Sequence, residues 1–188
     1  LSNNASTIGS YDLEVIDPVV GENKTLDLIK NNNYDILFLV GQDNLKIKKK
    51  SGLIIYIGSH GDKGAEIADI VLPGATYTEQ DGYYTNLEGK LQKSYKASYP
   101  PGEAKEDWEI FNELSELIKS KKIYKDKNVL IDSMINFLNI NKKNNFEGNL
   151  KTEFIEENIN IDLMDYYYSN VISRSSKTMT YCRNEKVN

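Results

Sequence analysis

Three short apolar runs in the first half of the chain predict β-strands. Residues 35–40 and 52–57 are nearly continuous in Ile, Leu, Val, Phe and Tyr, and a glycine follows each run. A third run, residues 69–72, stops at Pro73. Continuous apolar runs, rather than alternating ones, are typical of strands buried on both faces, as in parallel sheets. We therefore predict a small parallel sheet with crossover connections, an α/β fold.

Helical spacing of apolar residues predicts most of the remaining elements. Short helical turns suit residues 25–30 and 61–68. Residues 103–119 predict the longest helix, because their apolar side chains at positions 108, 111, 114 and 118 form one stripe. A second amphipathic helix is expected over residues 129–138. The intervening residues 76–99 are rich in Gly, Thr and Tyr and predict loops with short strands, one at residues 83–85.

The pattern weakens toward the C-terminus. Residues 139–149 are rich in Asn and Lys and predict a linker, residues 154–165 are acidic, and residues 169–183 are polar but compatible with helix. We predict a sheet-containing piece at residues 1–120, a helix with linker at 121–150 and an interface tail at 151–188. A three-stranded sheet needs neighbours at its edges, and the chain starts without Met. We therefore expect another polypeptide to complete it.

Composition and charge exclude several classes of function. The 188 residues include 23 Lys and Arg against 28 Asp and Glu, a formal net charge of −5, which argues against general nucleic-acid binding. One Cys excludes an internal disulfide or a cluster held by several cysteines of this chain, and one His excludes multi-histidine metal sites. No apolar run approaches the roughly 20 residues of a membrane-spanning helix.

Individual reactive residues do not indicate a catalytic site. The glycine-rich loop at residues 58–64 has the position of a phosphate-binding turn but not the dinucleotide spacing, so we interpret it as a tight turn that needs positive φ. His60 and Cys182 lack partners at known catalytic spacing, and the carboxylates of residues 62–88 lack calcium-loop spacing. We predict no catalytic, cofactor-binding or metal-binding residue in this chain.

A longer block is more specific. Residues 68–92 read ADIVLPGATYTEQDGYYTNLEGKLQ. The block resembles the signature of the molybdopterin oxidoreductase superfamily, in which AD, a hydrophobic stretch and LP precede a Glu and the pattern G-x-x-x-N-x-E-G-R-x-Q. Lys90 stands where that pattern has Arg, and lysine cannot form the bidentate contact that arginine makes with phosphate. The matching positions are Asp69, Pro73, Glu79, Gly82, Asn86, Glu88, Gly89 and Gln92.

Within that superfamily the chain most resembles the large iron–sulfur subunit of NADH:quinone oxidoreductase, respiratory complex I. Residues 61–65 (GDKGA), 100–108 (PPGEAKEDW) and 169–182 resemble further segments of that subunit. Residues 1–13 do so as well, with Glu14 in place of a glycine. The resemblance implies a C-terminal segment of the subunit: a partial doubly wound parallel-sheet domain completed by another chain, with C-terminal helices and an extended tail.

The resemblance also implies a role. The chain would support electron transfer from NADH to quinone as a non-catalytic part of a proton-translocating enzyme. Its partners would be the N-terminal portion of the same subunit, on another chain, and other peripheral-arm subunits, which would hold the iron–sulfur clusters and FMN. The implied location is the matrix side of the mitochondrial inner membrane, or else a bacterial cytoplasm. The open alternatives are a fragment of a molybdopterin-dependent enzyme such as a formate dehydrogenase, and a stand-alone nucleotide-binding module.

The signature residues and the tail have expected structural roles. Polar groups of the signature block would fix loop geometry by hydrogen bonding if they are buried. Aromatic residues and arginine are enriched at protein interfaces, and arginine can make bidentate contacts. We therefore expect the tail to contact a partner through Tyr166, Tyr167, Tyr168 and Arg174.

Overall fold

The computed structural model describes residues 7–15, 27–31, 33–42, 47, 51–143 and 165–187. The chain divides into two compact units, residues 1–143 and residues 144–188. The predicted boundaries at 120 and 150 stay predictions. No helix in the described ranges is both long and apolar enough to cross a membrane.

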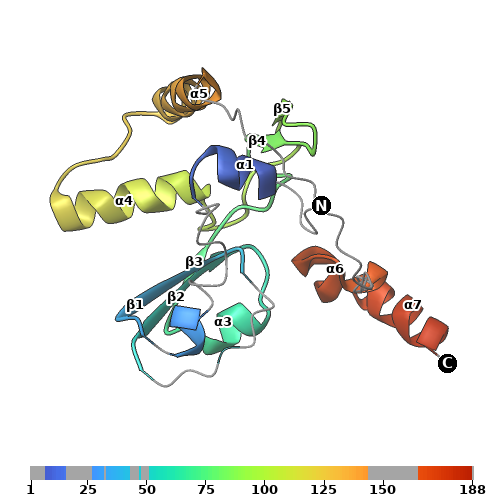
Figure 1. The fold of residues 1–188 in the computed structure, drawn as a ribbon. Helices are drawn as coiled ribbons and strands as arrows, with labels where there is room; N and C mark the ends of the chain where they lie inside the picture. Colours follow the sequence, from blue (N-terminus) through green and yellow to red (C-terminus); the bar gives the residue numbers. More distant parts are fainter. Residues whose placement is uncertain are drawn as a thin grey trace, which may run out of the picture. The chain divides into compact units, whose positions relative to one another are not determined.

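The first unit contains a three-stranded parallel sheet (Figure 1). The strand order is β1-β2-β3, with Leu39 opposite Tyr56 and Tyr56 opposite Val71. The predicted α/β fold with a parallel sheet is therefore confirmed. The strands are β1 (Ile36–Val40), β2 (Leu53–Gly58) and β3 (Ile70–Pro73).

The two faces of the sheet meet different helices, as Figure 1 shows. One face packs against α3 (Lys63–Ile67). On the other face, the ring of Phe38 lies 6.1 Å from the ring of Phe111 in α4 (Asp107–Lys119). The buried cluster beside α3 consists of Leu39, Ile54 and Tyr56, with Leu37, Ala65 and Ile67 packed against it.

Only the central strand is buried on both faces. In β2, the four residues from Ile54 to Ile57 are buried. By contrast, the side chain of Ile36 in β1 is 56% exposed and that of Val71 in β3 is 53% exposed. The prediction of three buried strands is thus wrong for β1 and β3. Both are edge strands, and the described helices cover only part of their side chains.

A two-stranded antiparallel sheet forms a hairpin beside α1 (Thr7–Asp12). Its strands are β4 (Gly82–Thr85) and β5 (Leu91–Ser94), and the strand predicted at residues 83–85 is confirmed. Thr85 is buried, and its Oγ1 would lie 3.2 Å from a Cβ atom placed on Gly9 of α1. A two-stranded hairpin is marginal by itself, so this packing stabilises it.

The predicted long helix begins later than expected. α4 starts at Asp107 rather than at residue 103. The N–H of Lys105 donates to the carbonyl of Pro73 at 3.1 Å, and the N–H of Ala75 donates to the carbonyl of Lys105 at 2.8 Å. The segment before α4 is therefore held in extended form at the end of β3, which prevents an earlier helical start.

The second long helix is longer than predicted. α5 spans Lys127–Lys143, so residues 139–143 are helical rather than linker. No Gly or Pro interrupts them, and Asn and Lys cost a helix only a few tenths of a kcal/mol per residue. Residues 144–149 of the predicted linker lie outside the described residues.

The helical turn predicted before β1, at residues 25–30, is confirmed in part. Residues 27–30 are helical, and residues 25 and 26 lie outside the described residues.

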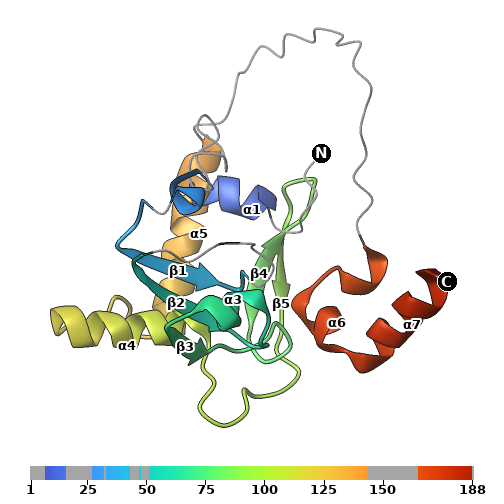
Figure 2. The ribbon, with the colours of Figure 1, turned by 90° about the horizontal axis from the view of Figure 1, so that it is seen from below.

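The second unit is helical over its described residues. It contains a 3₁₀ turn (Tyr166–Tyr168), α6 (Val171–Ser175) and α7 (Lys177–Val187), as Figure 2 shows. Residues 169–183, which are compatible with helix by sequence, are helical at 171–175 and 177–183. The expectation of an extended tail is wrong for residues 166–187, because a side chain caps the start of each helical segment. The accepting atoms are Asp165 Oδ1 for the N–H of Tyr167, Asn170 Oδ1 for the N–H of Ser173 and Ser176 Oγ for the N–H of Met179. Residues 151–164 lie outside the described residues.

A left-handed residue ends α1. Glu14 has φ of 55°, and the N–H groups of Glu14 and Val15 donate to the carbonyls of Tyr11 and Ser10 at 3.0 and 2.9 Å. This is the pattern of a Schellman C-cap, in which glycine is favoured because a Cβ is strained at positive φ. The residue is the one at which the resembling family has glycine.

We therefore expect Glu14→Gly to raise the free energy of unfolding by about 1 kcal/mol. The urea midpoint should rise while the slope of the transition stays constant. Glu14→Ala is the matched control, because alanine keeps the strained Cβ and loses the same carboxylate. Equal midpoints for the glycine and alanine variants would contradict the explanation.

Candidate functional site

The carboxyl edge of the parallel sheet is the candidate site, because α/β proteins hold ligands in the loops after their parallel strands. Glycines lie at the ends of the three strands here, at Gly41, Gly58 and Gly74. Gly41 N donates to Ile57 O at 2.8 Å, and Gly74 N donates to Gly58 O at 3.0 Å. The chain thus leaves the sheet at three neighbouring points along one edge.

The loop after β2 uses its polar groups in local contacts. The hydroxyl of Tyr56 donates to the carbonyl of His60 at 2.8 Å. Ser59 Oγ lies 2.9 Å from His60 Nδ1. Asp62 caps α3, since its Oδ1 accepts from the N–H of Lys63 at 2.8 Å. These contacts are those of a structural turn.

The glycines of this loop are needed for a reason other than the predicted one. Gly58, Gly61 and Gly64 are not among the positive-φ residues, so the prediction of a turn that needs positive φ is wrong. A Cβ on Gly58 would collide with the hydroxyl of Tyr56. One on Gly64 would collide with the carbonyl of Gln42 and lie 3.0 Å from the Tyr56 ring. Gly58 and Gly64 therefore make room for Tyr56, whose ring fills the space beside α3.

The carboxyl group of Asp107 also lies at this edge. Its Oδ1 would be 2.9 Å from a Cβ atom on Gly74. Burial raises the pKa of Asp107, and the neighbouring Glu106 carboxylate raises it further. The side chain placed beside Gly74 is thus a carboxyl group and not a cation that could pair with an anionic ligand.

Asp107 gives a prediction for the effect of pH. Because its pKa in the folded chain lies above the ordinary 3.8, the folded state holds the proton more tightly than the unfolded state. The contribution of Asp107 to stability is therefore full below the ordinary pKa and is lost as the pH rises through the folded pKa. We expect Asp107→Asn to change the free energy of unfolding more favourably at pH 7 than at pH 4, in urea titrations. An identical change at both pH values would contradict the assignment.

The first residues of the signature block hold β3 in place. Asp69 Oδ2 accepts from the N–H of Ile54 at 2.8 Å, and the N–H of Asp69 donates to the carbonyl of Ile54 at 2.8 Å. Pro73 ends the strand, and its carbonyl accepts from Lys105 N. These two residues fix both ends of β3.

The middle of the block closes two turns. Glu79 Oε2 accepts from Thr76 N at 3.0 Å, and the N–H of Glu79 donates back to Thr76 O at 2.9 Å. Asn86 Oδ1 accepts from the N–H groups of Glu88 and Lys90 at 3.0 and 2.9 Å. Asn86 thereby organises the turn between β4 and β5.

The remaining signature residues belong to the hairpin. Gly89 has φ of 76° in the turn, Gly82 begins β4, and Gln92 in β5 lies opposite Tyr84. The side chains of Glu88 and Gln92 are exposed, whereas those of Glu79 and Asn86 are half-buried. The signature residues are therefore spread along β3 and the hairpin, and their side chains do not come together at a single site.

The tyrosines predicted to form an interface have different surroundings. Tyr166 is 79% exposed. Tyr168 donates its hydroxyl hydrogen to Thr180 Oγ1 at 3.1 Å, and the guanidinium of Arg183 lies 4.7 Å from its ring centre. Arg174 Nη1 donates to the carbonyl of Tyr168 at 3.3 Å. Arg174 thus binds a carbonyl of its own unit, and the interface role of these residues stays a prediction.

A buried asparagine was missed by the sequence analysis. Asn112 of α4 is 6% exposed. Its Oδ1 accepts from the N–H groups of Ile123 and Tyr124, both at 2.9 Å, and its Nδ2 donates to the carbonyl of Tyr124 at 2.7 Å. These bonds tie the loop between α4 and α5 to α4. Its position four residues after Trp108 places it on the apolar side of the helix, which is the signal that could have revealed it.

A polar network joins the same two helices to the hairpin. Trp108 Nε1 donates to Glu106 Oε2 at 3.0 Å, and Lys127 forms an ion pair with Glu106. Lys127 Nζ also lies 4.0 Å from Asp81 Oδ2. The network includes Glu106, which entered the sequence analysis through the family resemblance, and Trp108, which also began the predicted apolar stripe.

A metal site needs several acidic, histidine or cysteine side chains close together. Within the described ranges, no group of three or more His, Cys, Asp or Glu side chains is arranged to hold a metal ion. Cys182 lies half-buried in α7 as a free thiol.

Comparison with known proteins gives one family and several relatives. Residues 1–117 match the family model described as molybdopterin oxidoreductase. The chain is 36% identical to the NADH-ubiquinone oxidoreductase 75 kDa subunit of Reclinomonas americana, over 97% of this chain and 28% of the relative. It is 37% identical to an NADH-quinone oxidoreductase subunit of Rickettsia bellii, over 97% and 27%. It is 34% identical to the mitochondrial NADH-ubiquinone oxidoreductase 78 kDa subunit of Candida albicans, over 78% and 23%. The chain therefore spans about a quarter of the length of these relatives.

Proposed function

The chain belongs to the molybdopterin oxidoreductase family, and from this membership we propose that it is a cofactor-free structural part of the large subunit of an NADH:quinone oxidoreductase. The similarity to the relatives from Reclinomonas americana and Rickettsia bellii over 97% of the chain supports this assignment. One observation carries the structural role. The side-chain oxygens of Asp69, Glu79 and Asn86 accept hydrogen bonds from backbone N–H groups of the same chain.

The pterin cofactor implied by the family does not fit the described carboxyl edge. The ring and hydroxyl of Tyr56 occupy the space beside Gly58 and Gly64. The carboxyl group of Asp107 lies at the same edge beside Gly74 and provides no cation to pair with a phosphate. Lys90, where the family signature has Arg, lies in the turn of the hairpin and cannot form a bidentate contact.

The proposed setting is the peripheral arm of the complex, on the matrix side of the mitochondrial inner membrane. A relative with a mitochondrial name supports a mitochondrial home. We propose that the remaining part of the subunit lies on another polypeptide and covers β1 and β3. Exposed apolar side chains at both edges of the sheet, such as Ile36 and Val71, support such a contact. Iron–sulfur clusters and FMN would then belong to partner polypeptides.

Electron paramagnetic resonance tests the absence of a cluster ligand in this chain. We expect His60→Ala and Cys182→Ser to leave the iron–sulfur signals of the purified assembly unchanged, because one His and one Cys supply too few ligands for a cluster. The amount of assembled protein serves as the control for folding. Loss of one cluster signal from an otherwise intact assembly would show that a residue of this chain binds that cluster.

A further inference from the structure

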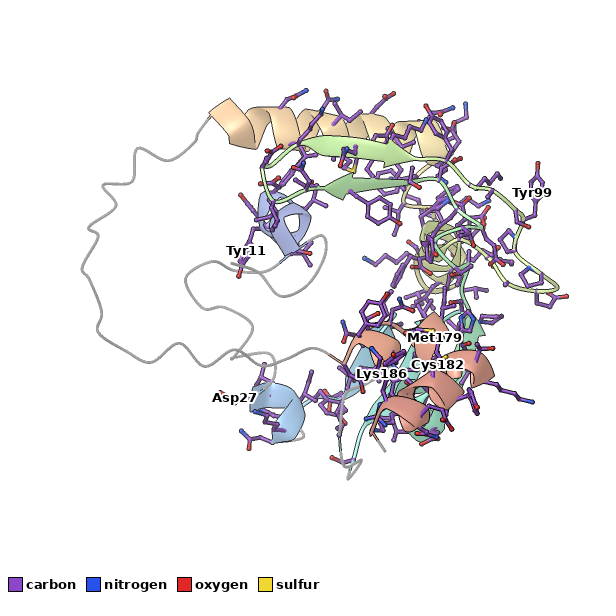
Figure 3. All side chains as sticks on the ribbon, turned by 90° about the vertical axis from the view of Figure 1, so that its right-hand side faces the viewer. Tyr11, Asp27, Tyr99, Met179, Cys182 and Lys186 are labelled. Atoms are coloured by element: carbon purple, nitrogen blue, oxygen red, sulfur yellow. The ribbon has the colours of Figure 1, made fainter. Side chains whose placement is uncertain are left out.

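The hairpin and the loop after it present an aromatic surface. Tyr95 and Tyr99 are 72% and 76% exposed. Figure 3 shows the side chain of Tyr99 pointing away from the neighbouring elements. Large exposed aromatic side chains in one segment are characteristic of interaction sites. We call this region the tyrosine–lysine surface; it consists of Tyr77, Tyr83, Tyr95, Tyr99, Lys93 and Lys96.

Lysine side chains hold these rings in position without burying them. The ammonium group of Lys93 lies 4.7 Å from the centre of the Tyr95 ring and 5.9 Å from that of Tyr83. The ammonium group of Lys96 lies 4.5 Å from the centre of the Tyr99 ring. Cation–π contacts at these distances are favourable. They reduce the freedom of both partners while leaving the tyrosine hydroxyls and the outer faces of the rings accessible.

The backbone beneath this surface is also fixed. The N–H of Lys96 donates to Asp81 Oδ1 at 3.0 Å. The N–H groups of Ala97 and Ser98 donate to the carbonyl of Thr78 at 2.8 and 3.1 Å. The loop is therefore tied to the segment before β4. A preformed surface loses less conformational entropy when it binds a partner.

The charge of the surface is opposite to that of the whole chain. Residues 90–99 contain three lysines and no carboxylate, although the chain has a net charge of −5. The hydrogen bond from Lys96 N lowers the pKa of Asp81, and Lys127, Lys93 and Lys96 lower it further. Lys127 is also paired with Glu106, so within the described residues the ammonium groups of Lys93 and Lys96 have only Asp81 as a nearby carboxylate partner, which leaves a local excess of positive charge.

We propose that the tyrosine–lysine surface binds an acidic segment of a second polypeptide. The tyrosine rings would pack against its apolar atoms, and Lys93 and Lys96 would pair with its carboxylates. A protein partner fits better than a single-stranded nucleic acid, because an ammonium group already covers one face of the Tyr95 and Tyr99 rings and the chain as a whole is acidic. The inference goes beyond the proposed function, since it does not depend on which assembly contains the chain.

Zero-length cross-linking tests the proposal directly. The tagged full chain is isolated from its native host with whatever polypeptides accompany it, and a carbodiimide then joins lysine amines to carboxylates in contact. We expect mass spectrometry to find Lys93 or Lys96 joined to an Asp or Glu of a second polypeptide. Acetylation of these two lysines should be several-fold slower than in the isolated chain, whereas acetylation of Lys119 and Lys121 should not change.

Variants give an independent readout. The double variant Lys93→Glu/Lys96→Glu should retain about tenfold less of the cross-linked polypeptide, because like charges then oppose each other. Lys119→Glu/Lys121→Glu is the matched control, with the same change of charge at exposed positions near the end of α4. Tyr95→Ala/Tyr99→Ala should also weaken retention. Circular dichroism of each variant establishes that its helix content is unchanged.

Several outcomes would overturn the proposal. The first is that Lys93 and Lys96 cross-link only to carboxylates of their own chain, and the second is that the Lys93→Glu/Lys96→Glu variant retains as much polypeptide as its Lys119→Glu/Lys121→Glu control. The third is recovery of the chain without a second polypeptide. The fourth is protection of the two lysines by a single-stranded RNA probe but not by the copurified polypeptide. NADH oxidation by the isolated assembly is measured in parallel. An assembly that lacks this activity yet shows the cross-links would reject the proposed function and retain the docking surface.

Discussion

Tyr56→Ala should lower the free energy of unfolding by about 3–5 kcal/mol, the range for removal of a large buried aromatic side chain. Tyr56 is 2% exposed at the centre of the sheet. Gly58 and Gly64 lie so close to its ring and hydroxyl that a Cβ at either position would meet them. Removing the ring therefore leaves a cavity between β2 and α3. The measurement is urea unfolding followed by circular dichroism.

Tyr56→Phe is the matched control. It keeps the ring and removes only the hydroxyl that donates to the carbonyl of His60, so we expect a loss of about 1 kcal/mol. The large difference between the two variants identifies packing as the main contribution of this residue. Similar losses for both variants would indicate instead that the hydrogen bond dominates.

Asn112→Ala should cost about 2–3 kcal/mol, because it leaves buried backbone groups without partners. The N–H groups of Ile123 and Tyr124 and the carbonyl of Tyr124 all bond to this one side chain. The loop between α4 and α5 should loosen as a consequence. Hydrogen exchange of the two amides should accelerate more than exchange within the sheet.

Asn112→Asp separates the two kinds of bond at this site. Its carboxylate can still accept from both N–H groups but cannot donate to the carbonyl of Tyr124. We expect amide protection at Ile123 and Tyr124 to persist, whereas the carboxylate oxygen that replaces Nδ2 faces the carbonyl of Tyr124 and destabilises that contact. Ser115→Ala removes an exposed hydrogen bond to the carbonyl of Lys121 and should have little effect. Unchanged exchange of the two amides in Asn112→Ala would contradict this explanation.

The fold was predictable where the signal lay in consecutive residues. The apolar runs of β1 and β2 and the glycines after them predicted the parallel sheet, and the stripe beginning at Trp108 predicted α4. The start of α4 was not predictable, because pairing of Lys105 with Pro73 and Ala75 depends on a contact between segments far apart in the sequence. The exposure of Ile36 and Val71 depends on which elements cover the edge strands. Local pattern does not contain that information.

The candidate site was predictable in its residues but not in its contacts. The family resemblance selected Asp69, Glu79 and Asn86, and each of them accepts backbone hydrogen bonds in the folded chain. The reason for Gly64 was misjudged, since close approach of Tyr56 and Gln42 cannot be distinguished from positive φ in the sequence. Asn112 was missed because its partners are backbone groups of a loop eleven and twelve residues away.

The central claim is that this chain is a cofactor-free part of an NADH:quinone oxidoreductase. The most direct measurement is purification of the tagged chain from membranes of its native host, with assay of NADH-dependent quinone reduction and of flavin, iron and molybdenum content. We expect the chain to copurify with this activity, with flavin and iron on other polypeptides and without molybdenum. An assembly that contains molybdenum and does not reduce quinone with NADH would contradict the claim.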